Sequence, residues 1–201
     1  AACVTSSHFA SAEKEFRYPL AYGNQRPLSS TWTVTGSGAF VVSSEKSDKD
    51  RAMITGLTIG KIVDYGIKDF MNSAADTIYQ HLQDFERKPE DYDKIVTGDL
   101  GTVGKKALID LLSQKGVDIS SVHMDCGIEI YDKSQAAHAG GSGCGCSAVT
   151  LSAYILKQIE EGKWKHVLFV PTGALLSKTS FNEGQSIPGI AHAVELVSCR
   201  G

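Results

Sequence analysis

Short apolar runs alternate with stretches of helical periodicity from residue 68 to the end of the chain. Four runs have the length and composition of buried strands, at residues 95–97, 122–131, 167–170 and 192–198. Between them, apolar residues recur at helical spacing around residues 70–82, 108–116 and 149–159. Such alternation is typical of βαβ units, so we expect an α/β fold.

Two β-rich runs precede this region, at residues 34–43 and 53–65, separated by a charged stretch at residues 45–51. Together they predict a long antiparallel hairpin. Because βαβ units pair in parallel and a hairpin does not, the sheet should be mixed.

Composition excludes several classes of protein. The 20 Lys and Arg residues do not exceed the 23 Asp and Glu residues, and no basic stripe is present, so nucleic acid is excluded as the main partner. Pro171 and Gly173 break the longest apolar stretch, which predicts a soluble chain. Five cysteines are too few for a secreted disulfide framework and indicate a reducing compartment. The first residues resemble a strand and not a signal peptide, which suggests a piece of a longer protein.

A run of small residues at positions 137–148 opens one of the predicted helices. Its glycines permit close approach of backbone or ligand, and the helix start offers N–H groups to an anion, which predicts a ligand wall. A second glycine-containing turn, at residues 97–106, also lies between a strand and a helix. Its spacing fits neither a P-loop nor a dinucleotide fingerprint, because five residues separate Gly98 from Gly104 and Lys106 occupies the hydroxyl position.

Cys144 and Cys146 lie near that helix start and allow three interpretations. Zinc is disfavoured because a C-x-C pair lacks the usual two-residue knuckle. Both cysteines can instead be small packing residues, or one can be a reactive thiol whose pKa the helix start lowers.

Polar side chains gather in three further places. His8 ends a strand-like segment and Arg17 follows on a predicted helix; these are a binding cluster or ordinary loop and ion-pair residues. His138 either faces a ligand or is a hydrogen-bonded core residue. The loop at residues 177–188 is either a ligand-binding loop or a solvated surface loop, and its candidate polar residues are Lys178, Asn182, Glu183 and Gln185.

Several segments together resemble the stage V sporulation protein AD family of the thiolase-like superfamily, found in endospore-forming bacteria. They lie at residues 5–8, 12–19, 33–36, 96–101, 138–147 and 170–193. The resemblance implies a layered α-β-α-β-α fold with mixed sheets, of which this chain supplies the C-terminal three fifths. Residues 1–66 would then end the first thiolase-like half, and residues 67–201 would form the second.

The same resemblance bears on chemistry. Condensing enzymes of the superfamily carry a nucleophilic Cys in the absent part and a His-Gln-Ala-Asn type motif, where this chain has Gly98-Asp99-Leu100-Gly101. Their second Cys is replaced near residues 182–185, and His138 is the one plausible surviving base. With these groups lost, we expect no catalytic residues and no enzyme. An acyl-transferring condensing enzyme and a purely docking subunit are the alternatives.

The family is understood to bind dipicolinic acid, pyridine-2,6-dicarboxylate, and to help move it into the developing spore. A planar dianion requires cations and N–H donors around an apolar slot. The expected contacts are His8, Arg17, His138 and Lys178, with Asn182 and Gln185 as further donors. No cofactor or protein-bound metal site is expected, although calcium can accompany the ligand.

Partners and location are implied in the same way. The resemblance implies a homodimer with residues 33–43 near its interface, and association with the membrane-embedded stage V sporulation A proteins. The protein would lie on the cytoplasmic face of the developing spore, peripheral to the spore inner membrane.

Overall fold

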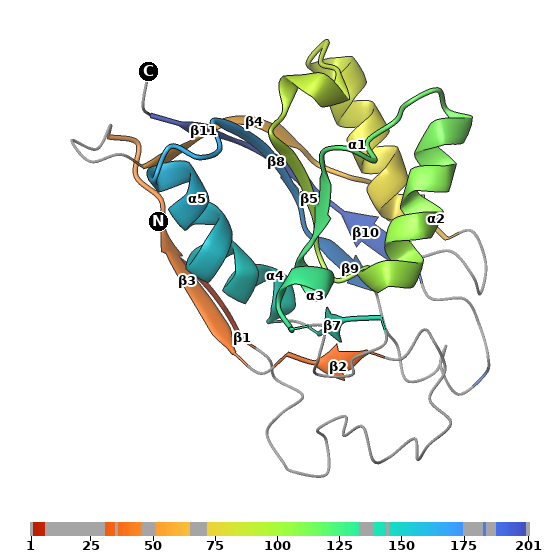
Figure 1. Ribbon diagram of the computed structural model, residues 1–201, viewed down its shortest axis with the longest axis horizontal. Helices are drawn as coiled ribbons and strands as arrows, with labels where there is room; N and C mark the ends of the chain where they lie inside the picture. Colours follow the sequence, from red (N-terminus) through yellow and green to blue (C-terminus); the bar gives the residue numbers. More distant parts are fainter. Residues whose placement is uncertain are drawn as a thin grey trace.

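A five-stranded mixed sheet forms the centre of the computed structural model, which describes residues 2–6, 31–34, 36–45, 51–64, 72–132, 139–143, 145–174, 183 and 188–199 (Figure 1). The strands are β1 (Ala2–Ser6), β2 (Trp32–Thr33), β3 (Ser37–Val41), β4 (Ala52–Thr58), β5 (Lys94–Thr97), β6 (His123–Asp125), β7 (Gly141–Ser142), β8 (His166–Val170), β9 (Thr172–Ala174), β10 (Gly189–Ala191) and β11 (Ala193–Ser198). The helices are α1 (Asn72–Asp84), the 3-10 turn η4 (Pro89–Asp91), α2 (Gly101–Gln114), α3 (Cys126–Glu129), α4 (Cys146–Thr150), the π-helical turn η6 (Leu151–Ile155) and α5 (Leu156–Glu160).

The central sheet has the strand order β4-β11-β8-β5-β6. Strands β5, β6 and β8 are parallel, whereas β11 is antiparallel to both β4 and β8, with a register shift between Glu195 and Leu196. The predicted mixed sheet is therefore confirmed. Strand β4 precedes residue 66 yet lies in the same sheet as the later strands; the division of the chain at that residue stays a prediction.

Both faces of the sheet are covered at β5, β6 and β8, and alternate residues of these strands pack into opposite cores. Ile95 and Leu168 belong to a cluster with helices α1 and α2, where Ile78 and Leu108 are fully buried. Their neighbours along the strands face the continuous helix α4-η6-α5 in a second cluster, whose members include Val96, Val167, Phe169, Ile155 and Ile159. This arrangement explains why the strands appear in the sequence as continuous apolar runs.

A second, two-stranded sheet lies on the far side of helix α4-η6-α5 (Figure 1). Strand β3 pairs antiparallel with β1 and contacts α4 and η6. Gly38 approaches the helix so closely that a Cβ atom there would lie 2.7 Å from the carbonyl oxygen of Ala148. The order of layers is thus helices, sheet, helix and sheet, as expected of the layered thiolase-like fold.

Two local predictions were wrong. Strands β3 and β4 do not form a hairpin with each other, because β3 pairs with β1 and β4 with β11. The run at residues 122–131 is a strand only as far as Asp125, where the Asp125 side chain caps helix α3. The other predicted helices and strands from residue 72 onward are present.

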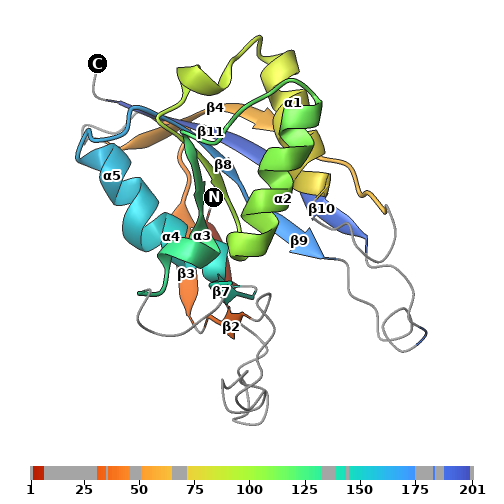
Figure 2. The same cartoon turned by 45° about the vertical axis from the view of Figure 1, so that its right-hand side comes forward.

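A separate two-stranded sheet lies next to the central sheet. Strands β9 and β10 pair antiparallel and continue the directions of β8 and β11 beyond Pro171, as Figure 2 shows. Residues 175–188 join these two strands. None of the helices in the described part of the chain is long and apolar enough to cross a membrane.

Candidate functional site

The six predicted ligand contacts, His8, Arg17, His138, Lys178, Asn182 and Gln185, all lie outside the described residues. Their described neighbours in sequence show which elements they follow or precede. His138 comes directly before Ala139, whose carbonyl oxygen accepts a hydrogen bond of 2.9 Å from the amide of Thr102 at the start of α2. The segment containing Lys178 and Gln185 joins β9 to β10. Ala139 and the start of β9, which are described, lie at the edge where β5, β6 and β8 end, and this edge is therefore the candidate site.

Asp125, at the end of β6, organises this edge. Its side chain is buried, and five donors surround its carboxylate: the amides of Leu100, Gly101, Gly127 and Ile128 and the hydroxyl of Thr97, at 2.7 to 3.3 Å. One carboxylate thus binds amides at the starts of both α2 and α3. Burial raises the pKa of Asp125 to about 6, and the hydrogen bonds from Thr97, Gly101 and Leu100 oppose that shift. The group is therefore ionised at neutral pH.

A chain of hydrogen bonds runs from Asp125 through Thr97 to the buried ring of His123. Thr97 Oγ1 donates to Asp125 Oδ2 at 2.7 Å and therefore accepts from His123 Nε2 at 2.9 Å. Burial, reinforced by the charge of Lys105, lowers the pKa of His123 to about 3, so the ring is neutral. Its Nδ1 atom is buried without a hydrogen-bond partner in the described part of the protein. This chain of side chains holds β5 and β6 together and does not reach solvent.

Asp99 connects the turn before α2 with the glycine loop before α4 and with the start of β9. Its Oδ2 atom accepts the amide of Gly143 at 2.8 Å, and its Oδ1 atom accepts the hydroxyl of Thr172 at 3.4 Å. A carboxylate of the protein itself therefore lies at the glycine loop before α4. The amide of Gly143 is therefore already bound by a carboxylate of the protein and is not available to an anionic ligand.

The glycines of the edge serve close packing of backbone on backbone. A Cβ atom at Gly101, where φ is +67°, would lie 2.3 Å from the carbonyl oxygen of Ala139. One at Gly140, where φ is +112°, would lie 2.3 Å from the carbonyl oxygen of Gly127. At the described positions, the predicted ligand wall is thus a contact between loops.

The turn before α2 is not a phosphate site, in agreement with its spacing. Asp125 accepts the amides of Leu100 and Gly101, and Ala139 accepts that of Thr102. These are the N–H groups that a phosphate would need.

The thiol of Cys146 is not activated, so a reactive thiol at that position was the wrong interpretation. Cys146 is fully buried, and burial, followed by the charge of Asp99, raises its pKa. Burial likewise raises the pKa of the neighbouring thiol of Cys126. Desolvation outweighs the helix start at this position. Cys144 lies outside the described residues, and the described residues contain no group of three His, Cys, Asp or Glu side chains able to hold a metal ion.

Sequence reasoning named His123 only as a candidate zinc ligand and missed the hydrogen-bonding roles of Asp125, Thr97 and His123. Asp125 was included in a longer strand, although Asp is among the preferred N-cap residues of helices. Nothing in the sequence indicated that the same carboxylate also binds the start of α2, since residues 101 and 125 meet only through the pairing of β5 with β6.

Comparison with known structures supports the layered fold. The tetronic acid condensing enzyme AbyA1 superimposes with a TM-score of 0.50 at 12% identity, covering 81% of this chain and 53% of that chain. The 3-oxoacyl-[acyl-carrier-protein] synthase III from Aquifex aeolicus VF5 gives a TM-score of 0.42 at 15% identity, covering 82% and 50%. The match to AbyA1 shows that the present chain has a thiolase-like fold.

Comparison of sequences identifies the family. The chain is 48% identical to stage V sporulation protein AD of Bacillus subtilis (strain 168) over 201 residues, which are 96% of this chain and 59% of that protein. It therefore spans about three fifths of the length of this curated relative. The family profile described as Stage V sporulation protein AD (SpoVAD) matches residues 1–197. The chain belongs to the stage V sporulation protein AD family.

Proposed function

We propose that the protein binds dipicolinic acid without catalysing a reaction and assists its uptake into the developing spore. Membership in a sporulation family supports the biological setting. The resemblance to stage V sporulation protein AD suggests the identity of the ligand, dipicolinic acid. The geometry at Gly98 favours binding over condensation.

The observation that carries this choice is the packing at Gly98. This glycine begins the segment found where condensing enzymes carry their His-Gln-Ala-Asn type motif. A Cβ atom at residue 98 would lie 2.6 Å from Thr172 Oγ1 and 2.9 Å from Ser147 Oγ. Hydroxyl groups therefore occupy the space into which a larger side chain would project, and this position holds no proton acceptor of the kind that condensation requires.

The ligand chemistry then points to the predicted contacts. His8, Arg17, His138 and Lys178 would offer positive charge or N–H groups to two carboxylates, and Asn182 and Gln185 would donate further hydrogen bonds. Asp125 already accepts the amide of Gly101, and Asp99 that of Gly143, so these two amides are not available to a ligand. Cationic side chains from the adjoining segments are therefore the proposed source of affinity.

We place the protein, in this proposal, on the cytoplasmic face of the developing spore, peripheral to the spore inner membrane. Its proposed partners are the membrane-embedded stage V sporulation A proteins and a second copy of itself. Calcium is proposed as a companion of the ligand, with no resident cofactor.

Calorimetric titration of dipicolinate into the whole protein, with and without calcium, tests this function. We expect saturable binding that falls at least tenfold in His8→Ala or His138→Ala, and unchanged binding in Lys106→Ala, which removes an exposed cation from α2. The same protein is then challenged with acyl-coenzyme A. Thioester turnover without dipicolinate binding would instead support the condensing enzyme, and neither activity would leave a docking subunit.

A further inference from the structure

The side chain of Asp99 connects two elements that no described pairing of strands joins. Asp99 follows β5 in the turn before α2 and is half-buried. Its Oδ2 atom accepts the amide of Gly143, directly after β7, at 2.8 Å, and its Oδ1 atom accepts the hydroxyl of Thr172, the first residue of β9, at 3.4 Å. Strand β7 pairs with β2, whereas β9 pairs with β10. Within the described part of the chain, Asp99 therefore bridges the glycine loop and β9.

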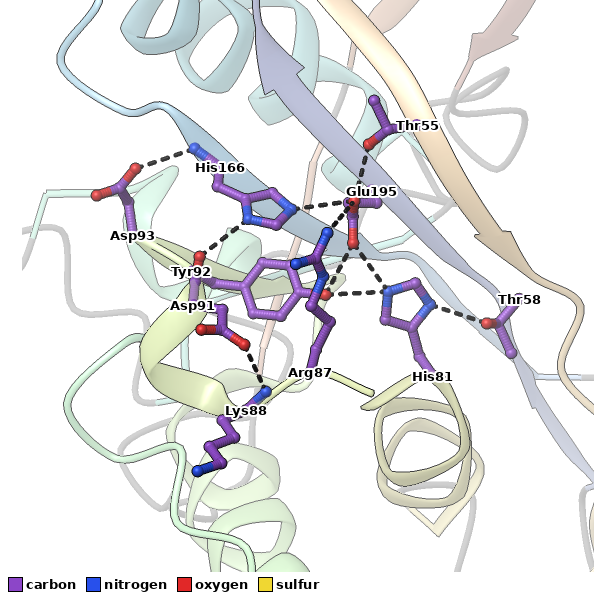
Figure 3. A network of polar contacts seen from close by, with 10 residues as sticks. All are labelled: Thr55, Thr58, His81, Arg87, Lys88, Asp91, Tyr92, Asp93, His166 and Glu195. Carbon is purple, nitrogen blue, oxygen red and sulfur yellow. Dashed lines mark hydrogen bonds and ion pairs between the residues drawn. The ribbon is translucent and has the colours of Figure 1, made fainter. Parts of the chain in front are cut away.

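The network of polar contacts around Glu195 shows the contrasting case (Figure 3). Glu195 on β11 is buried, and it accepts a hydrogen bond of 2.8 Å from the hydroxyl of Thr55 on β4. Strands β11 and β4 already pair along their whole lengths. The contact between Thr55 and Glu195 therefore reinforces an existing pairing, whereas the contacts of Asp99 link elements that do not pair.

The glycine loop, residues 139–143, is fixed to the rest of the protein by contacts that do not involve β9. The carbonyl oxygen of Ala139 accepts the amide of Thr102 on α2 at 2.9 Å. On its other side, the carbonyl oxygen of Ser142 accepts the amide of Val34, directly after β2, at 2.8 Å. These contacts fix the loop itself, but they do not set its position relative to β9.

Thr172 is the part of β9 that lies against the turn containing Asp99. A Cβ atom at Gly98 would lie 2.6 Å from Thr172 Oγ1 and 3.0 Å from the amide nitrogen of Thr172. Glycine at position 98 thus allows β9 to approach the turn closely. The hydroxyl that makes this approach is the one that donates to Asp99. Packing and a hydrogen bond therefore fix the start of β9 at the same point.

The sequence next to each partner of Asp99 contains separate predicted ligand contacts. His138 directly precedes the glycine loop, and Lys178 follows β9 in the sequence. Pyridine-2,6-dicarboxylate has two carboxylates on one rigid ring, so groups from two segments must be held at a fixed separation to bind both. Segments that are ordered only on binding lower the affinity, and segments held beforehand avoid that loss.

We propose that Asp99 is a positioning residue of the ligand site. By bridging Gly143 and Thr172, it holds the glycine loop and β9 at the separation that one dipicolinate molecule requires. This inference rests on the proposed function. Because a carboxylate repels the carboxylates of the ligand, Asp99 acts through its two partners and not by direct contact.

Calorimetric titration of dipicolinate into the whole protein tests this role through Thr172, because changes there leave the charge of the site unaltered. Thr172→Val removes the hydroxyl but keeps the shape of the side chain, and it should weaken binding by about fivefold. Thr172→Ser restores a hydroxyl and should bind as tightly as the native protein. Thr55→Val removes a hydroxyl that also donates to a carboxylate, but between strands that already pair, and should leave the affinity unchanged.

Hydrogen exchange of the ligand-free protein measures the bridge itself. Exchange over β9 and β10 should be faster in Thr172→Val and in Asp99→Ala than in the native protein, and unchanged in Thr172→Ser. Native exchange in both altered proteins would overturn the bridge.

The affinities separate this inference from the function on which it rests. Equal dipicolinate affinity in the native protein and in Thr172→Val would overturn the positioning role and leave the function intact. Equal losses in Thr172→Val and Thr55→Val would overturn it as well, because they would reflect stability and not position. No dipicolinate binding by the native protein would overturn the inference together with the proposed function.

Discussion

At the scale of single residues, the buried carboxylate of Asp125 holds the described part of the candidate site together. Its carboxylate accepts hydrogen bonds from five groups on three elements. An Asn side chain keeps the shape but has one acceptor oxygen and turns an NH₂ group toward amides. Asp125→Asn should therefore lower the free energy of unfolding by about 3 kcal/mol in urea titration. Asp110→Asn, an exposed change on α2, should alter it little; equal effects of the two changes would contradict the capping role.

The neutral state of His123 makes a prediction about acid. The unfolded histidine binds a proton near its ordinary pKa of about 6.5, whereas the folded group does so only near about 3. Between these values the unfolded state holds more protons, so stability decreases as pH falls, by at most about 1.4 kcal/mol per pH unit. His123→Gln keeps the donor to Thr97 but does not titrate. Its urea unfolding should lose less stability than the native protein between about pH 6 and pH 4. Parallel pH profiles of the two proteins would contradict this account; Asp125 and His81 titrate in both.

Most of the hydrogen-bond partners at the candidate site could not be predicted from the sequence. His123, Thr97 and Asp125 are ordinary residues of predicted strands until the parallel register of β5 and β6 places residues 97 and 125 opposite each other. The predicted contacts His8, Arg17, His138, Lys178, Asn182 and Gln185 stay predictions, because they lie outside the described residues.

At the scale of elements, glycine is required in loops for two separable reasons, namely a positive φ and close contact with a neighbouring loop. Gly116 and Gly140 both have positive φ, but a Cβ at Gly116 meets nothing within 4 Å, whereas one at Gly140 meets the carbonyl of Gly127 at 2.3 Å. Gly116→Ala should cost about 1 kcal/mol from backbone strain alone. Gly140→Ala should cost about 3 kcal/mol or more, because the loops must also separate. Thermal and urea unfolding of both variants would measure the difference, and equal losses would show that the loop contact contributes nothing.

The helices and strands were easier to predict from the sequence than the pairing of the strands. Apolar spacing at residues 74, 78 and 82 predicted α1, and all three side chains are buried. The run at residues 167–170 predicted β8 for the same reason. The predicted hairpin failed because local pattern fixes that a segment is a strand but not which strand it pairs with; β4 finds its partner β11 more than a hundred residues later.

At the scale of the whole molecule, the sequence predicted an α/β fold with a mixed sheet, and resemblance to a family predicted its layers. Neither indicated which surface would stay uncovered. Strand β4 ends the order of the central sheet. Large apolar side chains are exposed along it and just beyond, namely Met53, Ile54, Leu57, Ile59 and Ile62.

An exposed apolar edge strand promotes pairing with other chains, so this edge should drive self-association of the chain. Placing lysine at Leu57 and Ile59, which are 56% and 75% exposed, should weaken association at least tenfold. Because little apolar area is lost from the core, thermal stability should hardly change. Val103→Lys removes an exposed apolar side chain from α2 instead and is the matched control. Sedimentation velocity over a range of concentrations measures the effect. If the double variant and the control associate alike, the contact between copies lies elsewhere, and the residue 33–43 region proposed for the dimer becomes the surface to change next.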